Sequence, residues 1–143
     1  PRRSGVLEPL CERRGDRNKS LIRAIPKDGG SRTALPPGQS LKCHQNQDGY
    51  YDVYGRMKWD DVSPTITGGC INPSKGRFLH PTEDRAITLR EAALLQSFPK
   101  DYIFSLRRGK YAAAEMIGNA LPPLFSKMQA EQIKQHLLAH KSN

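Results

Sequence analysis

Proline and glycine interrupt this chain so often that long regular elements must be few and loops many. The 143 residues include 11 Pro and 12 Gly, and turn-forming clusters stand at 28–31, 35–38 and 46–49. Residues 1–49 are therefore expected to be mostly irregular, with one short element at an apolar patch formed by Leu21, Ile22, Ala24 and Ile25. The length fits one ordinary domain or a piece of a larger one, and a start at Pro1 favours the piece.

Two short strands are predicted in the middle of the chain. Apolar side chains occupy odd positions, with polar residues between them, at Tyr51, Val53, Met57 and Trp59. This alternation is typical of a half-buried strand, here with a bend at Gly55. Residues 64–67 resemble a second strand that stops at Gly68 and Gly69, where the backbone can turn or come close to a ligand.

Three helices are predicted in the remainder. Thr88 and Glu91 have the spacing of a capping box, so a helix should start there and end before Pro99. A second helix should centre on 112–116 and end at Gly118, a good C-cap residue.

The third helix should begin at Pro122 and Pro123 and continue toward Leu138. Its apolar residues do not form one stripe, because Ile133 and Leu137 lie nearly opposite the face that carries Leu121, Leu124, Phe125 and Met128. Such a helix must contact two surfaces or remain partly without a partner.

Charge indicates a polyanionic partner. Lys and Arg number 23 against 14 Asp and Glu, a net charge of +9, which is typical of nucleic-acid binding. A merely solubilising surface is the alternative on charge alone. We find neither an apolar run of roughly 20 residues nor a secretory leader, and therefore expect a cytosolic chain without a membrane partner.

The three cysteines, Cys11, Cys43 and Cys70, are far apart and form no Cys-x-x-Cys pair, so we expect free thiols. A zinc site built from Cys43, His44, Cys70 and His80 would match no known ligand spacing, and no metal is predicted.

Two ordered segments go beyond composition. Residues 85–99 and 117–123 resemble the last two conserved motifs of DNA cytosine-5 methyltransferases. Upstream, residues 54–67 and 74–81 resemble the target-recognition region of bacterial members. The resemblance covers about residues 50–125, and four segments in the right order make coincidence an unattractive explanation.

The resemblance implies an α+β fold in three parts. Residues 1–85 would form a small irregular recognition domain with short strands, and 86–108 a helix and loop that frame it. Residues 109–143 would be C-terminal helices that belong to a doubly wound, S-adenosylmethionine-dependent methyltransferase domain.

The resemblance also implies two sets of binding residues. In the family a Thr followed by an aliphatic residue lies against the sugar-phosphate of the flipped cytosine, and Thr65 with Ile66 fits that place. The other candidate DNA contacts are Arg56, Lys58, Thr67, Gly68, Gly69, Lys75 and Arg77. The turn that lines the S-adenosylmethionine pocket corresponds to Gly118, Asn119, Ala120 and Leu121.

Another set should have a structural role. The residues expected to make buried polar contacts around the framing helix are Arg85, Thr88, Arg90, Glu91 and Gln96.

No catalytic residue is expected in this chain. Family members add a Cys thiolate to C6 of cytosine before C5 receives the methyl group, but the sequence has no Pro-Cys, no Glu-Asn-Val and no Gln-x-Arg-x-Arg. The expected partners are double-stranded DNA and the N-terminal catalytic domain of the same enzyme, in cis or as a separate chain. The expected setting is a bacterial restriction-modification system, in the cytoplasm at the nucleoid.

Alone, such a fragment should be inactive. The alternatives are a stand-alone DNA-binding or regulatory module, one subunit of a split methyltransferase, or a basic structural domain without activity.

Overall fold

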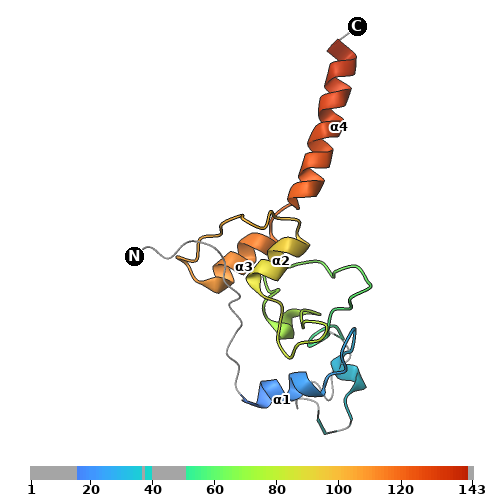
Figure 1. The fold of residues 1–143 in the computed structure, drawn as a ribbon, viewed down its shortest axis with the longest axis vertical. Helices are drawn as coiled ribbons and strands as arrows, with labels where there is room; N and C mark the ends of the chain where they lie inside the picture. Colours follow the sequence, from blue (N-terminus) through green and yellow to red (C-terminus); the bar gives the residue numbers. More distant parts are fainter. Residues whose placement is uncertain (1–15, 37, 40–50, 142–143) are drawn as a thin grey trace.

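The computed structural model describes residues 16–36, 38–39 and 51–141. In chain order the described elements are α1 (Asp16–Ala24), η1 (Arg32–Ala34), η3 (Pro73–Lys75), α2 (Leu89–Leu95), α3 (Lys110–Gly118) and α4 (Pro123–Lys141), the two η elements being short 3-10 turns. Helices α2 and α3 pack together in the middle, α1 lies at one end, and α4 projects away from the other (Figure 1). Within the described ranges, no helix combines the length and apolar character that crossing a membrane requires.

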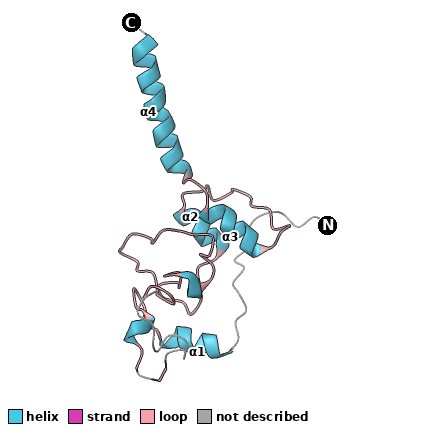
Figure 2. Ribbon diagram, turned by 180° about the vertical axis from the view of Figure 1, so that it is seen from behind, coloured by secondary structure: helices cyan, strands magenta, loops and turns pink. Residues whose placement is uncertain are grey.

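Loops rather than strands join the helices of the described residues (Figure 2). The β-type contacts there are two isolated bridges, a parallel one between Arg56 and Leu79 and an antiparallel one between Leu79 and Ala86. Backbone hydrogen bonds of 2.9 to 3.0 Å accompany them. The predicted strands over 51–59 and 64–67 are therefore wrong, and the α+β class is not confirmed in a structure that is mostly helical and irregular.

The alternation of apolar and polar residues between 51 and 59 wrongly predicted a strand, because the chain turns within this segment. Residues 51–54 form a turn that ends with Tyr54 in the left-handed region, at φ 57°. A two-residue period needs extended backbone throughout. As a result Tyr51 and Trp59 are 58% and 60% exposed, whereas Arg56 is completely buried.

Buried apolar side chains form two clusters. The larger surrounds the contact between α2 and α3 and includes Cys70, Phe78, Leu89, Ala93, Ala114 and Ile117. Alanine at several of these positions lets the two helices approach closely. The smaller joins α1 to the middle of the chain through Leu21, Ile22, Ile25, Tyr54 and Leu79, so the predicted short element at this patch is confirmed as α1.

The predicted helix starts are confirmed. Thr88 is the N-cap of α2, and both hydrogen bonds of the capping box with Glu91 are present. Helix α3 ends at Gly118, but the expected role of this glycine as the cap is wrong. The C-cap is Asn119, and Gly118 does not have the positive φ of a left-handed cap.

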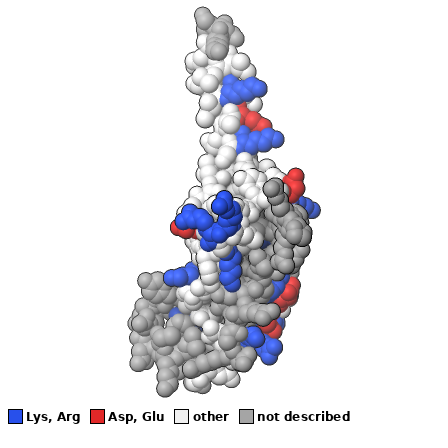
Figure 3. Space-filling model, turned by 90° about the vertical axis from the view of Figure 1, so that its left-hand side faces the viewer, with Lys and Arg blue, Asp and Glu red and all other residues white. Residues whose placement is uncertain are grey.

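Helix α4 exposes its apolar side chains on all sides. Those that are 50% to 64% exposed are Leu124, Phe125, Met128, Ile133, Leu137 and Leu138. No other described helix packs against α4, which agrees with its projection in Figure 1. Lys and Arg side chains gather in the middle of the body and recur along α4 on the face drawn in Figure 3.

Candidate functional site

Arg56 is buried and fully engaged inside the protein. Its guanidinium donates to the carbonyl oxygens of Ile22 (2.8 Å), Ile25 (3.1 Å), His80 (3.0 Å) and Glu83 (2.6 Å). It also donates to the carboxylate of Asp84 at 2.6 Å. Because the side chain has no exposed surface, the prediction that Arg56 contacts DNA does not fit this structure. The residue instead fastens α1 to the loop over 80–84.

The other three basic residues predicted to contact DNA fall into two groups. Arg77 is half-buried and donates to the carboxylate of Asp52 and to the carbonyl oxygens of Gly29 and Arg56. Lys58 and Lys75 are exposed, and neither has an ion pair with another described residue. Among the four basic candidates, only these two lysines present a charged group that a phosphate could reach without disrupting the fold.

The segment 65–69 lies directly against the end of α3. Thr65 and Thr67 are exposed, while Ile66 between them is 5% exposed and belongs to the main core. A Cβ at Gly118 would stand 2.1 Å from the carbonyl carbon of Thr67 and 2.2 Å from the amide nitrogen of Gly68. The two predicted binding segments are therefore in backbone contact, and Gly118 provides the space for it.

Gly68 and Gly69 serve packing within the protein. A Cβ at Gly68 would come within 3.2 Å of the Cα of Glu115, and one at Gly69 within 2.8 Å of the Cβ of Lys75. The close approach expected of these glycines is thus made to α3 and to Lys75.

Two residues that directly follow α2 hold the turn after α3 in place. The side-chain amide of Gln96 donates to the carbonyl oxygen of Ile117 at 3.1 Å and points to that of Ala120 at 3.5 Å. The hydroxyl of Ser97 accepts from the amide of Leu124 at 3.1 Å, which satisfies a free amide in the first turn of α4. Asn119 and Leu121 remain exposed on this fixed turn.

Arg85 and Glu91 form a bidentate ion pair, with N–O distances of 2.7 and 2.8 Å. Glu91 also accepts from the amide of Thr88 at 2.7 Å. Burial raises the pKa of Glu91, but the hydrogen bonds from Arg85 and Thr88 outweigh it and lower the pKa to about 2. Arg85 bonds Glu83 as well, so the start of α2 is tied to the preceding loop.

Arg90, the remaining predicted structural residue, links α2 to the segment that follows it. One terminal nitrogen donates to the carbonyl oxygen of Tyr102 at 3.0 Å. This bond connects α2 to the aromatic cluster of Phe98, Tyr102 and Phe104, whose ring centroids are 4.8 to 5.0 Å apart.

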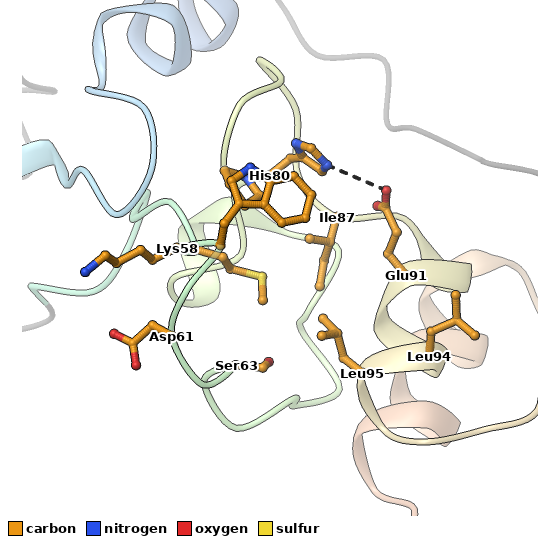
Figure 4. A pocket seen from close by; sticks show the side chains of 11 residues that line it. Lys58, Asp61, Ser63, His80, Ile87, Glu91, Leu94 and Leu95 are labelled. Carbon is orange, nitrogen blue, oxygen red and sulfur yellow. Dashed lines mark ion pairs between the residues drawn. The ribbon is translucent and has the colours of Figure 1, made fainter.

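An open cavity of about 380 Å³ lies between the segment 57–63 and α2. Ile87 and Leu95 point toward its middle, whereas Lys58 and Asp61 direct their charged ends away from it (Figure 4). Trp59 lines the cavity as well. The alternating sequence pattern assigned Trp59 only to a strand, although a single tryptophan beside a lysine in a polar segment was a signal that could have marked it as a surface group.

A second cavity of about 330 Å³ adjoins the turn after α3. It is lined by the aromatic cluster together with Ile103, Ser105, Met116, Ala120 and Leu121. Two of the four residues predicted to line the methyl-donor pocket therefore border a hollow with both polar and apolar lining.

The family model of the C-5 cytosine-specific DNA methylases matches residues 13–135 of this chain. This chain belongs to the C-5 cytosine-specific DNA methylase family. It is 45% identical over 113 residues to the Type II methylase M.HgiDII of Herpetosiphon aurantiacus, an alignment that covers 76% of this chain and 32% of the relative. It is 43% identical over 98 residues to the Type II methyltransferase M1.BsuMI of Bacillus subtilis, covering 67% and 22%.

This methylase chain spans about a third or less of the length of those relatives. A third relative is different. The Type II methyltransferase M.AquIB of Picosynechococcus is 32% identical over 109 residues, which cover 70% of this chain and 76% of the relative. That relative is therefore about as short as the chain described above.

Cys70 has none of the properties of a methylase nucleophile. It is a free cysteine with no exposed surface, and burial raises the pKa of its thiol to about 11. A thiol with this pKa stays protonated at neutral pH, and the thiolate is the reactive form. Cys11, Cys43 and His44 lie outside the described residues. Among the described residues, no cluster of His, Cys, Asp and Glu could hold a metal ion.

Proposed function

We propose that this chain is the DNA-recognition and donor-pocket part of a DNA cytosine-5 methyltransferase, an enzyme that flips a cytosine and methylates C5 from S-adenosylmethionine. The observation that carries the proposal is the backbone contact of Gly118 with Thr67 and Gly68. It brings the segment expected to contact DNA next to the turn expected to contact the methyl donor. A flipped base must lie near both DNA and donor, so this proximity is what the chemistry requires.

On the DNA side, the groups available to a phosphate are the ammonium groups of Lys58 and Lys75 and the hydroxyls of Thr65 and Thr67. Ile66, buried between the two threonines, holds the segment in place. Gly68 and Gly69 contribute by letting that segment pack on α3. Arg56 and Arg77 act indirectly, because their guanidinium groups hold the surrounding loops together.

On the donor side, the residues fit one wall of a pocket for S-adenosylmethionine. Leu121 and the aromatic side chains of the neighbouring cavity can contact the apolar parts of the donor, and the side chain of Asn119 offers an amide donor and acceptor. When bound, S-adenosylmethionine supplies the methyl group. The chain's own contribution is to keep the turn 118–121 in position through Gln96.

The reactive thiol should reside on a catalytic domain outside this sequence, joined in cis. Under this proposal residues 1–85 form the recognition region, 86–108 the framing helix and loop, and 109–143 the part that returns to the catalytic domain. The exposed apolar residues of α4 suit a helix that packs on another domain. The chain alone would not transfer methyl groups, and the whole enzyme would be a cytoplasmic bacterial protein of a restriction-modification system.

A second candidate is one subunit of a split methyltransferase, with the catalytic domain on a separate polypeptide. The observation that favours it is the short relative from Picosynechococcus, of which this chain covers 76%. Both candidates assign the same roles to the residues. They differ only in whether a peptide bond joins the two parts.

Salt dependence of DNA binding tests the proposal. The logarithm of the affinity of the 143-residue chain for a duplex should fall linearly with the logarithm of salt concentration, because released counterions dominate such binding. Replacing Lys58 and Lys75 by Ala should reduce the slope by about one for each phosphate that is no longer neutralised. Lys127→Ala on α4 is the matched control. Binding that is unaffected by salt, or slopes equal in all variants, would contradict the proposed DNA surface.

Size-exclusion chromatography separates a stand-alone module from a part that needs a partner. A chain with an uncovered apolar helix should self-associate, and it should become monodisperse when its catalytic domain is added. A monodisperse chain with full DNA affinity by itself would favour the stand-alone module.

A further inference from the structure

Trp59 has a large, mostly apolar side chain that is exposed to water, and such exposure is unfavourable. It is 60% exposed, and it borders the cavity of about 380 Å³ beside α2. Exposed single apolar residues are common, but an exposed indole at the edge of an apolar hollow is a typical ligand site.

The orientation of Trp59 is set from two sides. Its backbone amide donates to the carboxylate of Asp28 at 2.9 Å. Its ring lies perpendicular to that of His80, with 5.5 Å between centroids and an interplanar angle of 85°. A perpendicular contact leaves at least one face of the indole uncovered, so the ring is fixed and still available for stacking.

His80 is itself held in position. Its Nδ1 accepts from the amides of Thr82 (3.3 Å) and Glu83 (3.1 Å), which places the proton of the neutral ring on Nε2. Burial and the nearby Arg85 lower the pKa of His80, while the carboxylates of Glu83 and Glu91, 3.7 and 4.0 Å from its Nε2, act in the opposite direction. Trp59 therefore packs against a ring that its own hydrogen bonds hold in place.

The cavity combines an apolar interior with a polar rim. Ile87 and Leu95 face its middle, Glu91 lines it as well, and Lys58 and Asp61 direct their charged ends away from it (Figure 4). A flat ligand with apolar faces and polar edges suits this arrangement. Because Asp61 and Glu91 are carboxylates of the lining and the ammonium group of Lys58 points outward, an attached anion would have to lie outside the cavity, beside Lys58. A nucleobase attached to its phosphate has this combination of properties.

We infer that the cavity beside Trp59 binds one unstacked nucleobase of the DNA, with the indole stacked on the face of the base and Lys58 close to its phosphate. The inference rests on the proposed DNA binding and extends it to a second base site, separate from the segment 65–69. It makes Trp59 a determinant of affinity by stacking, which tolerates any base because every base has a flat aromatic face.

The sequence contains a single tryptophan, so intrinsic tryptophan fluorescence reports on Trp59 alone. The 143-residue chain is titrated with a mixed-sequence duplex carrying a fluorescein label. Anisotropy of the label measures DNA binding, and tryptophan emission from a parallel titration with unlabelled duplex measures stacking. Both signals should change with the same midpoint, and the emission should be quenched.

Trp59→Ala should weaken binding about 10-fold at constant salt without changing the salt slope, as expected when a base–aromatic stack is removed. Trp59→Phe should retain most of the affinity, which separates removal of the ring from a failure to fold. Ile133→Ala on α4 is the matched control, since Ile133 is 59% exposed.

Four outcomes decide the matter. Quenching together with weaker binding by Trp59→Ala supports the inference. The inference is overturned, but the proposed function stays intact, if the anisotropy rises while the tryptophan emission stays constant and Trp59→Ala binds DNA normally. No anisotropy change overturns both. Emission that responds to an added catalytic domain but not to DNA would assign the cavity to a protein contact instead, and would also overturn the inference.

Discussion

Gly118 packs on Thr67 so closely that no side chain fits between them, since a Cβ at Gly118 would stand 2.1 Å from the Thr67 carbonyl carbon. Backbone atoms on both sides make the contact incompressible. The contact joins the segment expected to bind DNA to the segment expected to bind the methyl donor. The relative position of these two segments therefore depends on a glycine, which has no Cβ, at position 118.

Gly118→Ala should destabilise the chain by about 1–3 kcal/mol, because overpacking forces backbone shifts of this cost. Urea denaturation followed by circular dichroism measures the change. Met116→Ala is the control on the same helix, and its half-exposed side chain should change stability by about 0.5 kcal/mol or less. Equal stability of Gly118→Ala and the parent chain would disprove the tight contact.

Arg56→Lys should cost about 3 kcal/mol or more of folding free energy, although both side chains are cationic. The guanidinium of Arg56 serves four carbonyl oxygens and the Asp84 carboxylate, and one ammonium group cannot reach them all. Equilibrium unfolding of this variant should be compared with that of Lys75→Arg, an exposed exchange expected to be neutral. If the two exchanges had similar effects, Arg56 would have no special structural role.

Acid should remove the contribution of ionised Glu91 to the stability of the chain. The pKa of Glu91 is about 2 in the folded protein against an ordinary value of 4.5. Its ionised form therefore stabilises the fold fully above about pH 4.5, and this contribution is lost as the pH falls toward 2.

The stability difference between the parent and Glu91→Gln should accordingly be large near pH 6 and shrink below pH 4.5, as measured by thermal unfolding at a series of pH values. A difference independent of pH would mean that the ion pair with Arg85 does not control this titration.

Leu124→Glu combined with Met128→Glu should leave the stability of the chain nearly unchanged but abolish its association with the catalytic domain. Both side chains are more than 60% exposed, so the folded chain loses little, whereas an interface would have to bury two charges. Unfolding curves measure the first effect and light scattering of the mixed proteins the second. Association that survives these charges would exclude this face of α4 from the interface.

The helices could be predicted from the sequence because their signals are local. Thr88 and Glu91 specify the start of α2 within four residues, and Pro123 marks the start of α4. The irregular path of residues 51–67 could not be predicted, because the position of Arg56 is fixed by acceptors 24 to 34 residues away in the sequence.

The candidate site was predictable to the same degree. Segments 65–69 and 118–121 were found through the family resemblance, but their mutual contact is a tertiary property. Arg56 was predicted to contact DNA because it lies in the segment that resembles the recognition region and because a guanidinium group matches both a phosphate and a guanine edge. Its burial depends on carbonyl oxygens at the end of α1 and in the loop over 80–84, which no local pattern reveals.

Transfer of a tritiated methyl group from S-adenosylmethionine to duplex DNA tests the central claim most directly, namely that this chain holds DNA and borders the donor while the reactive thiol belongs to another domain. The full-length relative from Herpetosiphon aurantiacus serves as the positive control for the assay. The purified 143-residue chain should incorporate no label by itself, and label should appear only when its catalytic domain is added. Label at C5 of cytosine with the chain alone would contradict the account.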